Sequence, residues 1–161
     1  MLITFLRHAT AEDSSMSIPD ADRGLIDKGE KQVKRVAAFC LANELMPGLI
    51  YCSPLLRAQQ TARILNQRLP GSPAPQTVDW LGIDTSAQTI VTELAKLAEQ
   101  SMNDVWLVGH EPDFSVTIAH LLGTVPDNII IKKASLTRLD ADIADQTSAK
   151  LLWSIPCALM R

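Results

Sequence analysis

The chain has 161 residues, of which 47% are hydrophobic and 20% charged, with 15 basic and 18 acidic side chains. This is the composition of an ordinary globular protein long enough to bury a core, so we expect one domain over residues 1–161. The formal charge of −3 and the 4% of aromatic residues argue against a nucleic-acid-binding surface. No apolar run approaches the roughly 20 residues of a membrane span, and the apolar N-terminal run is too short for a signal peptide.

The three cysteines, Cys40, Cys52 and Cys157, are odd in number and widely spaced. They form no Cys-x-x-Cys pair, so neither a disulfide framework nor a structural zinc site is indicated. Reduced thiols are typical of a cytoplasmic protein, and we expect a cytoplasmic location with no membrane partner.

The chain opens with an apolar, β-prone run, Leu2 to Leu6, which predicts a buried strand that ends at Arg7-His8. The polar stretch from Ala11 to Ala21 then predicts a loop. Asp27 stands three residues before Glu30, as at the start of a capping box, and apolar residues recur at helical spacing from about 28 to 45.

A second strand and helix follow in the next third of the chain. Leu49 to Cys52 predicts a short buried strand, and Ser53-Pro54 predicts the N-cap and first position of a helix up to Pro70. Arg57 falls in the first turn of that helix. Thr77-Val78 predicts a further short strand.

A third strand–helix unit and a hairpin complete the chain. Asp104 to Val108 predicts a core strand, after a helix that Thr85 or Ser86 caps and before a helix that ends at Gly123. We expect further strands at Ile129–Ile131, Ala134–Leu139 and Leu151–Ile155, with a polar loop from Asp140 to Ala149. The whole predicts a three-layer α/β sandwich with a mostly parallel central sheet and an antiparallel edge.

Three predicted strand ends deliver polar groups: Arg7-His8, then Ser53 to Arg57, then His110-Glu111. Because parallel strands present their carboxyl ends at one edge of a sheet, we expect these groups to meet there. Arginines offer bidentate donors to phosphate oxygens, and helix amino termini add free N–H groups. The pattern predicts an anion site with an imidazole as its nucleophile.

The residues that carry this pattern also resemble a known family. Leu-Arg-His-Ala, Ser-Pro-Leu-Leu-Arg-Ala-Gln-Gln-Thr-Ala and Val-Gly-His-Glu-Pro, in that order, resemble the histidine phosphatase superfamily with its phosphoglycerate mutase-like fold. Size and motif order are most similar to its small SixA-type phosphohistidine phosphatases. The resemblance implies that His8 accepts the phosphoryl group and that Arg7, Arg57 and His110 bind it.

The implied function is a protein phosphohistidine phosphatase that works through a phospho-His8 intermediate, without a metal or other cofactor. The arginines would stabilise the charge of the transferring phosphoryl group. The implied partner is a phosphohistidine-bearing domain, such as a histidine phosphotransfer domain, and the product is phosphate. A site built from His8, His110 and Glu111 for a cation is disfavoured, because Arg7 and Arg57 would repel it.

The sequence departs from the family pattern at two places. Ala9 stands where the family has Gly, which matters only if that position needs a positive φ. Of the SixA-type pattern Arg-Pro-Leu-Thr-x-x-Gly, the chain keeps Arg23, Leu25 and Gly29.

The proton donor is left open by the sequence. Glu111 follows the second histidine and is our preferred general acid, although it could instead cap the helix after it. Asp79 and Asp84 are the carboxylates in the short stretch where larger members carry an insertion. A site without a strong donor fits phosphohistidine, whose P–N bond is labile.

Two other functions remain open at this point. One is a small-molecule phosphatase, for example for a sugar phosphate, and the other is a non-catalytic phospho-binding module in which His8 only contacts the ligand. Five further residues are read as structural or as solvated: Arg23, Cys52, His120 and the pair Lys132-Lys133. For Arg23 the alternative is that it reaches the pocket from the loop.

Overall fold

The computed structural model describes residues 1–14, 17–143 and 147–161. The strands are β1 (Leu2–Arg7), β2 (Leu49–Cys52), β3 (Gln76–Thr77), β4 (Asp104–Gly109), β5 (Leu136–Asp142) and β6 (Ser148–Ile155). The α-helices are α1 (Asp27–Ala42), α2 (Leu56–Arg68), α3 (Ala87–Glu99) and α4 (Asp113–Leu122). Short 3₁₀ helices are η1 (Asp20–Asp22), η2 (Asp79–Leu81), η3 (Pro126–Asn128) and η4 (Cys157–Leu159).

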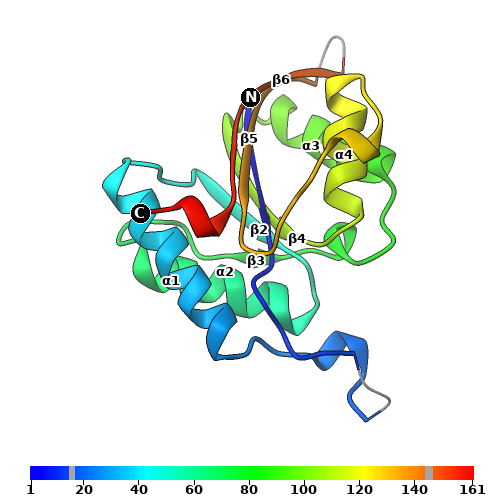
Figure 1. Cartoon of the computed structure of the whole chain (residues 1–161). Coiled ribbons are helices and arrows are strands. Elements are labelled where there is room, and N and C mark those ends of the chain that lie inside the picture. The colour runs from blue at the N-terminus through cyan, green and yellow to red at the C-terminus, as the bar shows by residue number, and fades with distance from the viewer. Residues whose placement is uncertain (15–16, 144–146) are drawn as a thin grey trace.

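The strands form one sheet in the order β3-β2-β4-β1-β5-β6. The first four strands of that order are parallel, whereas β5 pairs antiparallel with β1, and β6 pairs antiparallel with β5. Helices α1 and α2 cover one face of the sheet, and α3 and α4 cover the other (Figure 1). The predicted α/β sandwich with an antiparallel edge is therefore confirmed.

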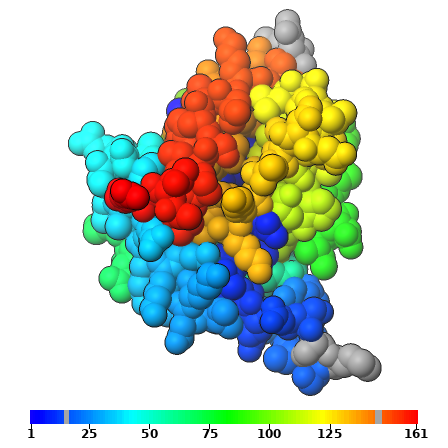
Figure 2. Space-filling view, viewed as in Figure 1, coloured from blue at the N-terminus to red at the C-terminus, as the bar shows by residue number. Residues whose placement is uncertain are grey.

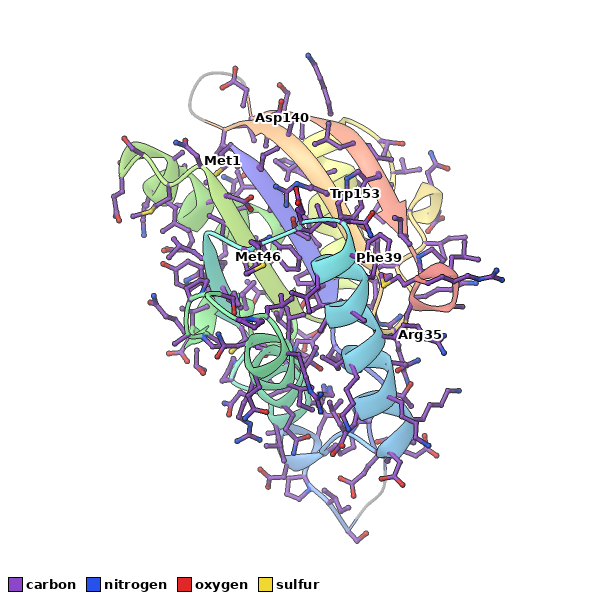
Figure 3. All side chains as sticks on the ribbon, turned by 90° about the vertical axis from the view of Figure 1, so that its left-hand side faces the viewer. Met1, Arg35, Phe39, Met46, Asp140 and Trp153 are labelled. Carbon is purple, nitrogen blue, oxygen red and sulfur yellow. The ribbon has the colours of Figure 1, made fainter. Side chains whose placement is uncertain are left out.

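Each face of the sheet has its own hydrophobic core. Val33, Leu65 and Trp106 belong to the cluster under α1 and α2, and all three are fully buried. Figure 3 looks onto this side, where Phe39 on α1 and Trp153 on β6 pack against the cluster and are partly buried. The second cluster lies under α3 and α4. Alternate residues of the central strands thus supply both cores, which is why these strands read as nearly continuous apolar runs.

Most predicted elements are confirmed with small shifts of their ends. The Ser86 hydroxyl accepts the N–H of Thr89 as the N-cap of α3, and Gly123 ends α4 with φ 66°. The prediction of a capping box at the start of α1 is wrong, because Asp27 already belongs to the helix. The N-cap residue is Ile26, whose side chain makes no capping hydrogen bond. Of the two predicted polar loops, residues 15–16 and 144–146 lie outside the described part of the chain.

The strand predicted at Ile129–Ile131 is wrong. These residues form an extended connection from η3 to β5, and Ile130 is 78% exposed. Figure 2 shows this gold-coloured segment on the surface between α1 and α4. The chain turns sharply at Ala134, whose φ is +55°, and the N–H of Ala134 bonds to the carbonyls of Arg7 and His8. The segment therefore meets β1 at its end and cannot pair along it.

The first half of α1 packs against the turn that follows His8. The Gln32 side chain accepts hydrogen bonds from the backbone N–H and the hydroxyl of Thr10, at 2.9 and 2.8 Å. Gly29 is buried at the closest approach, where a side chain would collide with the Thr10 carbonyl oxygen. The helix thus fixes the backbone that comes directly after the strand end.

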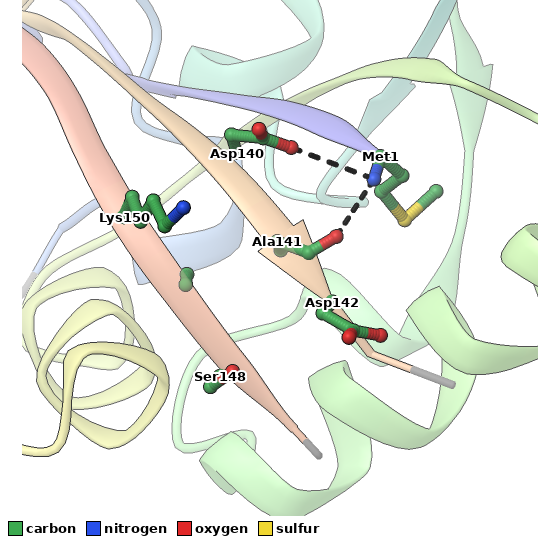
Figure 4. A pocket seen from close by; sticks show the side chains of 7 residues that line it. Met1, Asp140, Ala141, Asp142, Ser148 and Lys150 are labelled. Carbon is green, nitrogen blue, oxygen red and sulfur yellow. Dashed lines mark hydrogen bonds and ion pairs between the residues drawn. The ribbon is translucent and has the colours of Figure 1, made fainter. Parts of the chain in front are cut away.

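The opposite end of β1 is held by the chain's amino group. The Met1 ammonium donates to the Ala141 carbonyl at 2.7 Å and lies 3.8 Å from the Asp140 carboxylate (Figure 4). These groups and the β5–β6 hairpin line a hollow of about 440 Å³, at the end of the sheet away from His8. Among the described helices, none is both long and apolar enough to cross a membrane.

The packing of Gly29 yields a prediction about stability. Alanine normally favours a helix over glycine by about 1 kcal/mol, but the added methyl would meet backbone that cannot move away. We therefore expect Gly29→Ala to lower the free energy of unfolding by about 1–3 kcal/mol in urea denaturation. Lys31→Ala, at an exposed position of the same helix, is the control, and a Gly29→Ala protein as stable as that control would contradict the packing argument.

Candidate active site

The three strand ends that the sequence singled out are neighbours in the sheet. In the sheet, β4 lies between β2 and β1, with Arg7 paired to Gly109 and Cys52 paired to Val108. The pairing continues one residue beyond the strands, since His8 donates its N–H to the Gly109 carbonyl at 3.0 Å. The predicted convergence of Arg7-His8, Arg57 and His110-Glu111 at one edge is confirmed.

These side chains surround a cavity of about 240 Å³. It is lined by Arg7, His8, Ala11, Arg23, Arg57, Ile83, His110, Glu111 and Lys133. Four of these nine residues are cationic and two are histidines. The lining is suited to an anion of the size of a phosphoryl group.

The His8 imidazole is fixed in one tautomer. Its Nδ1 lies 2.8 Å from the Ala9 carbonyl oxygen, which can only accept, so Nδ1 carries the hydrogen and Nε2 has a free lone pair. Burial lowers the pKa of His8 to about 4, and the positive charges of Arg57, Arg7 and Lys133 contribute to this shift. The hydrogen bond to Ala9 acts in the opposite direction and raises the pKa. The ring is therefore neutral near pH 7, as a nucleophile requires.

Ala9 fits the turn behind His8 without strain. It is fully buried, and it is not among the residues with positive φ in the described part of the chain. Its N–H donates to the Thr61 hydroxyl at 3.1 Å, and that hydroxyl donates to the Arg57 carbonyl at 2.7 Å. The turn with Ala in place of Gly therefore keeps a direct link to the helix that carries Arg57.

The two predicted arginines are held by acceptors far away in the chain. Arg7 donates from Nη1 to the Ile131 carbonyl at 2.7 Å. Arg57, only 4% exposed, donates from Nη1 to the Asp20 carbonyl at 2.7 Å and from Nη2 to the Asp20 carboxylate at 3.0 Å. Burial lowers the pKa of Arg7, while the nearby Glu111 acts in the opposite direction.

His110 lies beside His8, with the two ring centres 5.1 Å apart. Its Nε2 is 2.7 Å from the Ser53 hydroxyl, which also accepts the N–H of Leu55. Burial, then the proximity of His8 and Arg57, lowers the pKa of His110 to about 3. The expected N-cap role of Ser53 is wrong, because α2 begins at Leu56 and Ser53 instead orients this imidazole.

Close packing behind His110 explains the glycine that precedes it. A side chain on Gly109 would lie 2.7 Å from the ring of Phe114. That ring is buried and meets Phe5 of β1 edge to face, with ring centres 5.1 Å apart. Gly109 thus allows α4 to fold back closely after the strand and places His110 and Glu111 at the cavity.

Glu111 both lines the cavity and caps α4. Its carboxylate accepts the N–H of Ser115 at 3.1 Å, so the helix-cap alternative is part of the structure. Burial raises the pKa of the Glu111 carboxyl group, although its hydrogen bonds to Ser115 act against this. Because a carboxyl group with a raised pKa holds its proton more readily, Glu111 is still a candidate for the proton donor.

The carboxylates considered as alternatives lie elsewhere. Neither Asp79 nor Asp84 lines the cavity, and the loop between η2 and α3 presents Ile83 to it instead. Asp84 has φ +62°, and its backbone N–H and that of Thr85 bond to the Asp113 side chain. This loop therefore supplies an apolar wall and no acid.

Two cavity residues were misread in the sequence. Solvated side chains were favoured at Arg23 and Lys133, with the pocket as the alternative for Arg23. Lys133 is exposed and Arg23 is partly buried, and both line the cavity. The signal for Arg23 was available, since Asp20 lies three residues before it and the two form an ion pair. Lys133 was missed because it lies between two predicted strands, where a pair of lysines is typical of a solvated connection. The structural readings of Cys52, which is buried, and of His120, which is exposed on α4, agree with the structure.

The comparisons with known proteins agree with this geometry. The family model described as "Histidine phosphatase superfamily (branch 1)" matches residues 3–81. An uncharacterized protein of Picosynechococcus sp. is 34% identical over 145 residues, which cover 89% of this chain and 87% of that protein.

Among solved structures, the protein histidine phosphatase SixA in complex with tungstate has a TM-score of 0.89 at 18% identity, with both chains fully covered. A mycobacterial glucosyl-3-phosphoglycerate phosphatase has a TM-score of 0.75 at 20% identity, with 93% of this chain and 96% of that chain covered. At these identities the likeness concerns the fold alone.

The two lowered histidine pKa values predict how stability depends on pH. Below its ordinary pKa of 6.5, each imidazole binds a proton in the unfolded chain, whereas in the folded chain His8 and His110 stay neutral down to about 4 and about 3. The free energy of unfolding should therefore fall from pH 6.5 towards pH 4, by about 1.4 kcal/mol per pH unit for each histidine.

Urea denaturation at pH 7 and pH 5 in phosphate-free buffer measures this dependence. Replacing one of the two residues, as in His8→Gln, should roughly halve the loss attributable to the pair. A variant with the same pH dependence as the unmodified chain would show that the folded imidazole titrates normally.

Proposed function

The chain belongs to the histidine phosphatase superfamily, and from this premise we propose that it hydrolyses phosphohistidine on a protein through a phospho-His8 intermediate. The observation that carries the proposal is a set of buried nitrogen atoms without hydrogen-bond partners, all on residues that line one cavity. Arg7 Nε, Arg57 Nε and His110 Nδ1 have no hydrogen-bond partner in the described structure. Buried polar groups are costly when unpaired, and phosphoryl oxygens would accept hydrogen bonds from the two arginines.

His8 acts first, as the nucleophile. Its Nε2 attacks the phosphorus atom of the substrate, and the P–N bond to the leaving imidazole breaks. The Ala9 carbonyl keeps the hydrogen on Nδ1 and holds the ring in place during the transfer. The guanidinium groups of Arg7 and Arg57 neutralise the charge that spreads over the phosphoryl oxygens.

Water completes the turnover. It attacks the phosphorus atom of phospho-His8, the bond to Nε2 breaks, and phosphate leaves with His8 restored to its neutral form. Both protons of the water leave with the phosphate. Glu111 is the proton donor to the leaving group in the first step, because burial favours its protonated form and its carboxyl group lines the same cavity. The chemistry requires no metal, since cationic side chains already surround the phosphoryl group.

The open cavity supports a protein-borne substrate. The loop before α3 is short and contributes Ile83, which is 45% exposed, where an enclosing insertion would otherwise stand. A phosphohistidine on the surface of a histidine phosphotransfer domain could reach His8 without a lid having to open. In that role the protein would remove phosphoryl groups from a cytoplasmic signalling relay.

A small-molecule phosphatase is the second candidate. The observation that favours it is Lys133 at the cavity, which adds positive charge beyond that of the arginines around the phosphoryl group. Such charge would suit a phosphate ester that carries a carboxylate. The substrate experiment below decides between the two.

Removal of the nucleophile is the first test. We expect His8→Ala to lose turnover of phosphoramidate and of a phosphohistidine protein by at least about 1,000-fold, because no other group lies in line for attack. It should also lose the acid-labile, base-stable label that ³²P-substrate leaves on the enzyme. His120→Ala, on the exposed side of α4, is the control and should retain both. Binding of phosphate without any labelled His8 in the unmodified chain would identify a non-catalytic binding module.

Glu111→Gln separates the helix cap from the proton donor. The amide oxygen can still accept the Ser115 N–H, so the fold should persist, but the carboxyl proton is lost. We expect hydrolysis of phosphohistidine to change by less than about threefold, and hydrolysis of a phosphate ester to fall by about 100-fold, because an alcohol leaving group needs an acid. A clear preference of the unmodified enzyme for 3-phosphoglycerate over a phosphohistidine domain would overturn the substrate assignment.

A further inference from the structure

One carboxylate that does not come from the strand ends contacts two of the arginines at the cavity. Asp20, in η1, accepts hydrogen bonds at Oδ1 from Arg23 Nε and Nη2, at 2.9 and 2.5 Å. Its Oδ2 accepts from Arg57 Nη2 at 3.0 Å, and its backbone carbonyl accepts from Arg57 Nη1 at 2.7 Å. Both guanidinium groups therefore take their position from a single residue.

The loop that carries Asp20 is itself closed. Arg23 donates from Nη1 to the Glu12 carbonyl at 2.6 Å, and the Gly24 N–H donates to the Glu12 carboxylate at 2.8 Å. The backbone of Glu12 in turn donates to the Gly24 carbonyl at 2.9 Å. These bonds close the base of the loop, and the bonds from Arg57 to Asp20 join it to the start of α2. The Arg23 side chain is 18% exposed and lines the cavity.

Both arginines keep donors for a ligand. A guanidinium group has five N–H donors. The bonds to Asp20 and Glu12 engage three donors of Arg23, and those to Asp20 engage two of Arg57. The remaining N–H groups include Arg57 Nε, which is buried without a partner.

The charge state of Asp20 suits this role. Hydrogen bonds from Arg23, and then from Arg57, lower the pKa of the Asp20 carboxyl group even though burial acts in the other direction. The group is therefore ionised near neutral pH. Its side chain is 43% exposed, so its strength as a purely electrostatic partner is limited by solvent screening. The distinctive feature of Asp20 is its geometry: the carboxylate accepts three hydrogen bonds and the backbone carbonyl a fourth, all from two arginines.

We propose that Asp20 is a positioning residue that holds Arg57 and Arg23 as a pair, and that Arg23 is a third arginine that binds the substrate's phosphoryl group. This inference rests on the proposed function, because it assumes that the cavity receives a phosphoryl group. Asp20 does not touch the ligand in this scheme. It acts by keeping two flexible side chains in the orientation in which their free donors converge.

Simple electrostatics and positioning predict opposite effects when Asp20 loses its charge. Removal of a negative charge next to an anion site should strengthen anion binding if the arginines stay where they are. If instead Asp20 orders the arginines, its loss should weaken anion binding, because two long side chains must then be ordered by the ligand itself. The sign of the change therefore separates the two explanations.

The test is the binding of inorganic phosphate, measured by isothermal titration calorimetry, because it requires no turnover. We expect Asp20→Asn and Arg23→Gln each to raise the Kd for phosphate by about 10-fold, which corresponds to one lost charge-assisted interaction. Asp22→Asn is the matched control, since Asp22 is exposed in the same 3₁₀ helix and makes no ion pair in the described part of the chain. It should bind phosphate as the unmodified chain does.

A double variant tests whether Asp20 acts through Arg23. In an Arg23→Gln background, Asp20→Asn should have a smaller effect on Kd than it has alone, because one of the two cations that it orients is gone. With phosphoramidate as substrate, the single variants should raise KM and lower kcat while His8 is still labelled. A merely structural contribution would leave the two effects on Kd additive.

The outcomes keep this inference separate from the proposed function. Asp20→Asn binding phosphate as tightly as, or more tightly than, the unmodified chain would overturn the positioning role. Unchanged phosphate binding by Arg23→Gln would overturn the third-arginine assignment, and this variant remains informative if the Asp20 variant does not fold. Absence of phosphate binding by the unmodified chain would overturn the proposed function along with the inference.

Discussion

A buried guanidinium group of Arg57 and a partly buried one of Arg7 lie beside two buried imidazoles, and the fold must compensate their loss of contact with water. Most of the acceptors come from remote parts of the chain: the Ile131 carbonyl for Arg7 and the carbonyl and carboxylate of Asp20 for Arg57. Burial, and then the same positive charge, keeps His8 neutral. Burial and positive charge together thus explain both the contacts around the cavity and the reactivity of its nucleophile.

Much of the fold could be predicted because the physical signals were local. The buried strands before Arg7, Ser53 and Gly109 read as apolar runs, and the Ser86 cap and the Gly123 stop fix helix ends through their own side chains or φ angles. The extended segment at Ile129–Ile131 was wrongly assigned as a strand. Its composition favours a strand, but its partners are decided by tertiary contacts that local composition does not encode.

The candidate site was predictable to the extent that strand ends determine it. Arg7, His8 and His110 follow directly from the convergence of parallel strands, and Arg57 follows from the first turn of the next helix. Asp20, Arg23 and Lys133 were not found, because loops place them and a loop's path depends on bonds such as those between Glu12 and Gly24. The contact of Ser53 with His110 was hidden for a related reason. A serine before a proline signals a helix cap, and its contact with His110 spans 57 residues of sequence.

The Thr61 hydroxyl, which accepts from Ala9 and donates to the Arg57 carbonyl, has a mechanical consequence. It links the turn after His8 to the first turn of α2, so a shift of that helix would move the backbone of Arg57 and the turn behind the nucleophile together. The loop of Arg23 and the segment of Lys133 are coupled to the same residues, through the bonds from Arg57 to Asp20 and from Ala134 to the carbonyls of Arg7 and His8. A substitution in either of these two segments can therefore change the position of the nucleophile without touching it.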